Sequence, residues 1–101
     1  MKKEALKELA IHVREAIAIG QAAADTVEDG GTCNMDTLTI YLPGTRMPSM
    51  QELGISRYKL RDSFAISCSF GQADKNTKGV RAAADHLKSK GYDASVWYQI
   101  D

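Results

Sequence analysis

Three cations lie on one side of a segment that the sequence predicts as the start of a helix. Lys75, Lys78 and Arg81 follow one another at intervals of three residues, so we expect them on a shared helix face. A helix N-terminus carries partial positive charge, and a cation there costs roughly 0.3–1 kcal/mol. Asp74, the expected N-cap, is the only acidic residue nearby until Asp85. This placement has two interpretations: an ordinary solvated helix face, or a site for an anionic ligand such as phosphate.

Neighbouring residues would complete such an anion site. Gly71 and Gln72 form a turn before the helix, and Asn76 lies in its first turn, where unpaired N–H groups can bind phosphate or carboxylate. If the sheet is parallel, Arg46 reaches the same edge from the loop after the first strand. The turn lacks the glycine pattern of a Walker or dinucleotide-binding loop, so we expect no cofactor such as ATP or NAD.

The C-terminal segment offers an aromatic surface. Trp97 and Tyr98 are adjacent in a predicted strand, so their side chains point to opposite faces and one of them faces outward. An outward ring could stack on a nucleotide base or pack against a partner. We include Tyr98 in the candidate ligand site.

A glycine-rich loop is the secondary candidate, and it consists of Gly30, Gly31, Thr32, Cys33 and Asn34. Adjacent glycines expose backbone amides and permit positive φ. A Cys33 nucleophile would need a base, and the only histidines, His12 and His86, fall on predicted helices with no sequence link to it. We therefore favour a structural turn, or a contact with a ligand or partner, and assign no catalytic residue. Cysteines and histidines lack the close spacing of zinc ligands, so no metal site is expected.

Composition narrows the class of protein. The chain has 101 residues, 44% hydrophobic and 26% charged, which predicts one domain over residues 1–101. Thirteen basic and thirteen acidic residues cancel, so neither specific DNA binding nor binding to an anionic membrane is expected. No apolar stretch approaches the roughly 18 residues of a membrane span. Two cysteines without a signal-like N-terminus indicate a reducing cytoplasm.

The elements that position these residues are predicted to alternate in the order α-β-α-β-α-β. We expect a helix over the first 28 residues, strands at 37–42, 63–70 and 94–100, a short helix at about 49–54 and a helix at about 74–90. The result is an α/β fold with a small three-stranded sheet, two long helices and one short helix. The unit from 63 to 100 has the length of a parallel crossover, and an antiparallel first strand remains open.

The first helix has an apolar surface wider than one contact needs. Ile11 and Ile19 lie off its main apolar seam, and Gly20 allows another backbone to come close. The helix either lies across its own sheet or also packs against a second copy. Because a three-stranded sheet leaves exposed edges and a bare face, we favour a homo-oligomer formed through this helix.

Three segments together resemble a family of small proteins encoded by phages and prophages. They are Asp-Gly-Gly-Thr-Cys-Asn at 29–34, Gly-Gln-Ala at 71–73 before the basic helix, and Gly-Tyr-Asp-Ala at 91–94 leading to Tyr-Gln-Ile-Asp at 98–101. The resemblance covers residues 25–101. It implies an accessory protein of a mobile element, of the kind that blocks host defence in the bacterial cytoplasm, and it assigns no residue roles.

These observations lead to three expectations about function. The first is a non-enzymatic protein that sequesters a phosphate-bearing small molecule, such as a nucleotide immune signal. The alternative is a protein-binding inhibitor of a host defence complex, with the cationic helix face docked on an acidic surface. The third is a small cysteine-dependent enzyme centred on Cys33.

Overall fold

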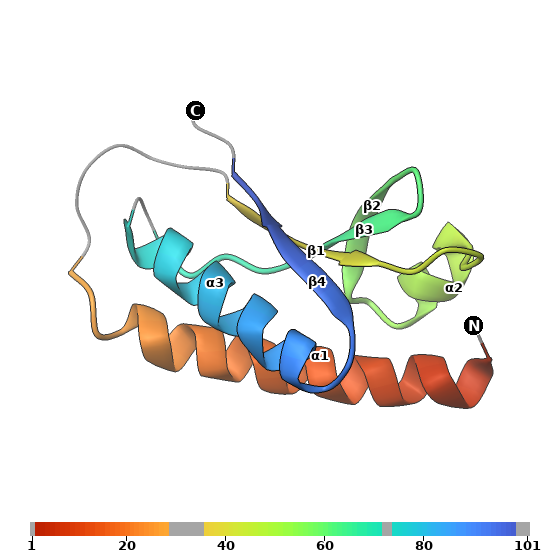
Figure 1. Ribbon diagram of the computed structural model, residues 1–101, viewed down its shortest axis with the longest axis horizontal. Helices are drawn as coiled ribbons and strands as arrows, with labels where there is room; N and C mark the ends of the chain where they lie inside the picture. The colour runs from red at the N-terminus through yellow and green to blue at the C-terminus, as the bar shows by residue number, and fades with distance from the viewer. Residues whose placement is uncertain (1, 29–35, 72–73, 99–101) are drawn as a thin grey trace.

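Helices cover one face of a four-stranded antiparallel sheet (Figure 1). The computed structural model describes residues 2–28, 36–71 and 74–98. Its elements are α1 (Lys3–Ala24), β1 (Thr37–Tyr41), α2 (Met47–Glu52), β2 (Ser56–Leu60), β3 (Ser63–Ile66), α3 (Asp74–Ser89) and β4 (Asp93–Trp97). No helix within these three ranges is both long and apolar enough to cross a bilayer.

The strand order is β2-β3-β1-β4, and every neighbouring pair is antiparallel. β3 and β4 are therefore parallel to each other with β1 between them, and α3 makes the crossover that joins them. In the same way α2 connects β1 to β2 across β3. This double split β-α-β arrangement is the ferredoxin-like strand order. The expected crossover from 63 to 100 is present, and the first strand takes the antiparallel position that the sequence left open.

The predicted fold class is confirmed: a mixed α/β fold with two long helices, one short helix and a small sheet. The three expected strands are present, and β2 adds a fourth at one edge. Two features hid β2 in the sequence. Its residues, Ser-Arg-Tyr-Lys-Leu, show no clean apolar alternation, and the hairpin to β3 turns at Arg61, with φ 57°, instead of at glycine or asparagine.

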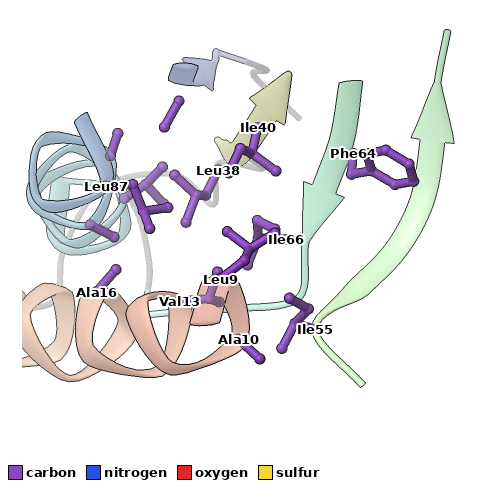
Figure 2. Close-up of a cluster of buried hydrophobic side chains, with 14 of the residues drawn as sticks. Leu9, Ala10, Val13, Ala16, Leu38, Ile40, Ile55, Phe64, Ile66 and Leu87 are labelled. Carbon is purple, nitrogen blue, oxygen red and sulfur yellow. The ribbon is translucent and has the colours of Figure 1, made fainter. Parts of the chain in front are cut away.

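The core lies between the sheet and the two long helices. Leu38 and Ile40 of β1 and Ile66 of β3 point toward Leu9 of α1 and Leu87 of α3 (Figure 2). All five side chains are fully buried. This packing follows from the alternation of the strands and the 3.6-residue period of the helices, which place these residues on facing surfaces.

α1 and α3 pack side by side in opposite directions and come unusually close at one point. A Cβ atom built on Gly20 would lie 2.6 Å from the carbonyl oxygen of Gly79 and 2.7 Å from the Phe70 ring. Gly20 therefore serves a contact within the chain. Ile11 and Ile19 remain 56% and 42% exposed on the outer surface of α1.

Candidate functional site

The exposed face of α3 carries a mixed stripe of charge. Five residues spaced 4-3-4-3 form it, namely Asp74, Lys78, Arg81, Asp85 and Lys88, and all five are exposed. The opposite face of the helix is apolar and buried. The stripe therefore presents three cations and two carboxylates to solvent, which leaves one net positive charge.

Two hollows flank this stripe and share Arg81. One, of about 420 Å³, is lined by Val27, Asp74, Thr77, Lys78 and Arg81. The other, of about 620 Å³, lies between α3 and the edge strand β4 and is lined by Arg81, Ala84, Asp85, Lys88, Ser95, Val96 and Tyr98. We call the two hollows together the Arg81 groove.

The Tyr98 ring forms one wall of this groove beside Arg81. The Arg81 Cζ atom lies 6.0 Å from the ring centroid, at the limit of a cation–π contact. Tyr98 follows Val96 on the helix-facing side of the sheet, and its side chain is 56% exposed. Trp97 stands opposite Thr37 in the β1–β4 register, on the other face of the sheet. Tyr98, and not Trp97, therefore belongs to the groove.

Lys75 and Lys78 have partners in the residues that directly follow α1. The Lys78 Nζ donates a hydrogen bond to Thr26 Oγ1 at 2.7 Å, and the Lys75 Nζ lies 3.9 Å from Asp25 Oδ1. Because the two helices are antiparallel, the start of α3 lies beside the C-terminal end of α1, which carries partial negative charge. The chain itself thus supplies part of the negative charge that the sequence analysis assigned to a ligand. Lys75 does not line the groove, whereas Lys78 and Arg81 do.

The Asn76 side chain has a structural role, whereas ligand binding by the backbone N–H groups of the first turn stays a prediction. The residue is only 4% exposed. Its Oδ1 accepts a hydrogen bond from the Phe70 N–H, and its Nδ2 donates one to the Asp36 carbonyl oxygen, both at 3.2 Å. Thr77 Oγ1 donates to Asp36 Oδ2 at 2.8 Å. These bonds tie the start of β1 and the chain after β3 to α3.

The placement of Arg46 at this site is wrong, because that prediction depended on a parallel sheet. Tyr41 at the end of β1 pairs with Ser63 at the start of β3. α3 follows the end of β3, so its N-terminus and α2, which Arg46 directly precedes, lie at opposite ends of the sheet (Figure 1). Arg46 is exposed and precedes α2.

The remaining predicted residues divide into two groups. Gly71 is exposed just before α3, with a φ of 130° that favours glycine. Gln72 and the loop from Gly30 to Asn34, including Cys33, lie outside the described residues. The interpretation of that loop as a turn, a contact or a cysteine site therefore stays a prediction.

Sequence reasoning missed Asp85 and Lys88 as groove residues. The predicted site was built on the three-residue spacing of Lys75, Lys78 and Arg81. Two residues three positions apart differ by about 60° in direction around the helix axis. Lys75 and Arg81 are consequently about 120° apart and do not share one face. The 4-3-4-3 spacing from Asp74 to Lys88 is visible in the sequence and would have identified the stripe.

Comparison with known proteins identifies no relative of this chain. It matches no family model, no curated protein and no solved structure. The strand order by itself is compatible with many activities and assigns none. The residues of the Arg81 groove are therefore the features of this chain that bear on its function.

Proposed function

We propose that the protein is a non-enzymatic binding protein that holds a phosphate-bearing small molecule, such as a nucleotide, in the Arg81 groove. The observation that carries this proposal is the position of Arg81, which borders both hollows and lies beside the Tyr98 ring. A guanidinium offers paired donors to phosphate oxygens, and an adjacent ring provides a stacking surface for a base. Lys78 adds a second positive charge to the same lining.

The size and polarity of the groove support a ligand of this class. Hollows of about 420 and 620 Å³ fall within the roughly 300–1,000 Å³ usual for small-molecule sites. The carboxylates of Asp74 and Asp85 disfavour a simple polyanion, because they repel charge along part of the stripe. They suit a ligand that combines phosphate with hydroxyl donors, such as a ribose, whose hydroxyls an acidic side chain can bind.

The biological setting belongs to the same proposal. We propose that the protein is a phage or prophage accessory protein that acts in the cytoplasm of a bacterial host and sequesters a nucleotide immune signal. The support for this setting is the resemblance of the segments at 29–34, 71–73 and 91–101 to phage-encoded proteins. The groove supports the ligand class, not the setting.

Calorimetry with linear and cyclic nucleotides tests the proposal. At least one nucleotide should bind at micromolar concentration, and Arg81→Ala should weaken its affinity at least tenfold. Arg46→Ala is the matched control, because it removes an exposed arginine at the other end of the sheet and should leave the affinity unchanged. The proposal fails if no nucleotide binds, or if Arg81→Ala binds as well as the unsubstituted protein.

A protein partner is the second candidate, favoured by exposed apolar side chains away from the groove. Ile11 and Ile19 are both exposed on the outer surface of α1. Exposed apolar side chains that gather on one surface are typical of interaction sites. The occupant is either a second copy of the chain through α1 or a host defence protein.

A further inference from the structure

The only two histidines of the chain meet at the interface of α1 and α3. His12 Nδ1 lies 2.9 Å from Glu15 Oε1, and His86 Nε2 lies 3.6 Å from the same oxygen. One potential ligand atom from each of the three residues lies within 4.8 Å of the other two. His12 and Glu15 are close because they are three residues apart on α1, whereas His86 arrives from α3.

His86 brings a ring nitrogen that has no hydrogen-bond partner among the described residues. Its Nε2 is fully buried, and 3.6 Å to Glu15 is too long for a hydrogen bond. Buried polar atoms in folded proteins are almost always paired, so an unpaired one calls for a specific explanation. A metal ion between the three residues would give this nitrogen a partner.

We propose that His12, Glu15 and His86 bind a divalent transition-metal ion, with zinc the best match. Ligand atoms about 2.0–2.1 Å from a tetrahedral zinc ion are about 3.3 Å from one another. The two separations from Glu15 Oε1, 2.9 and 3.6 Å, lie on either side of that value, and the ligand atoms of the two histidines lie within 4.8 Å of each other, so zinc binding requires the side chains to draw together. Two imidazoles and one carboxylate are an established zinc ligand set, with the fourth position left to water. Glu15 is 49% exposed, which leaves solvent access for that position.

The surroundings of the three ligands support this assignment. Glu8 Oε1 lies 3.6 Å from His12 Nε2, the ring nitrogen that points away from Glu15. At this distance the Glu8 carboxylate makes no hydrogen bond to the ring, but its negative charge favours a cation at the neighbouring ligands.

The bound ion would join the middle of α1 to the end of α3. No metal site was expected from the sequence, because local spacing does not show that side chains from two different helices meet. The site is separate from the Arg81 groove, since His86 faces α1 while Arg81 and Lys88 face β4 and solvent. Zinc binding and nucleotide binding can therefore succeed or fail independently.

Titration with zinc sulfate tests the assignment. All titrations use tag-free protein that carries both Cys33→Ser and Cys68→Ser, so that thiols do not compete for the ion. EDTA first removes any metal that is already bound. We expect one zinc ion per chain with micromolar affinity or better and a raised unfolding temperature. His86→Gln and Glu15→Gln should each weaken zinc binding at least tenfold, whereas Glu4→Gln, an exposed carboxylate near the start of α1, should not change it. Undiminished binding in His86→Gln overturns the proposal, as does the absence of binding at millimolar zinc.

A second measurement guards against variants that fold poorly. This measurement uses the protein with both histidines intact. In its ¹⁵N spectrum, zinc should shift the signals of His12 Nδ1 and His86 Nε2 over the same range of zinc concentration. Histidine ring signals that do not change at saturating zinc would show that the ion binds elsewhere, and the proposal would then be wrong.

Discussion

Asn76 shows how a single buried amide can hold together segments that are distant in the sequence. From the first turn of α3, its side chain accepts a hydrogen bond from the Phe70 N–H and donates one to the Asp36 carbonyl oxygen. In the sequence, a polar residue near a helix N-terminus is easily interpreted as a ligand contact. Local spacing does not show which backbone groups from distant segments pack against it in the fold. Its role became evident only from the packing of β1 and the chain after β3 against α3.

Replacement of this amide should therefore weaken the fold. Asn76→Ala leaves the Phe70 N–H and the Asp36 carbonyl without these bonds, and we expect the free energy of unfolding to fall by about 1–3 kcal/mol. Urea denaturation measures the change. Gln51→Ala, which removes an exposed amide from α2, should stay within about 0.5 kcal/mol of the unsubstituted protein. A change as small in Asn76→Ala would contradict the structural role.

The antiparallel pairing of α1 and α3 explains much of what is unusual in both helices. It places Lys75 and Lys78 beside Asp25 and Thr26, and it brings Gly20 against Gly79. The helices themselves could be predicted from the apolar period of α1 and α3 and from the Gly91 stop. Their mutual orientation could not, because it depends on the order of strands in the sheet.

The close approach of these helices gives a prediction about α1. Gly20→Ala puts a methyl group 2.6 Å from the Gly79 carbonyl oxygen, so the helices must separate or the Phe70 ring must move. Overpacking of this kind costs about 1–3 kcal/mol, and thermal unfolding should show a lower midpoint. Ala22→Leu adds bulk on the exposed side of the same helix and should leave the midpoint nearly unchanged. Equal midpoints for Gly20→Ala and the unsubstituted protein would mean that the helices are not packed this closely.

The sheet shows where prediction from sequence succeeds and where it stops. β1 was found because Thr37–Tyr41 alternates and is rich in β-branched residues. β2 was missed because its pattern is polar and its hairpin lacks a glycine signal. Arg46 was misplaced because strand direction is a property of the assembled sheet. The same distinction holds for the candidate site. The charged stripe of α3 can be recognised from local sequence spacing. The proximity of Tyr98 to that stripe, and of His12 to His86, depends on the tertiary fold.

At the level of the entire chain, the exposed apolar residues predict self-association. Ile11 and Ile19 lie on the outer surface of α1, where a second copy could cover them. We expect sedimentation velocity to show a dimer or larger species. The double variant Ile11→Glu with Ile19→Glu should sediment as a monomer. Its stability should be unchanged, because both side chains already face solvent. A chain that sediments as a monomer at high micromolar concentration would contradict this prediction.

The central claim is that the Arg81 groove is the ligand site, and NMR mapping of a bound nucleotide tests it most directly. During titration with a nucleotide that calorimetry has identified, the largest amide shifts should occur at the α3 residues around Lys78 and Arg81 and at the end of β4 near Tyr98. Shifts confined to α2, to the outer surface of α1 or to the face of the sheet opposite the helices would contradict the account.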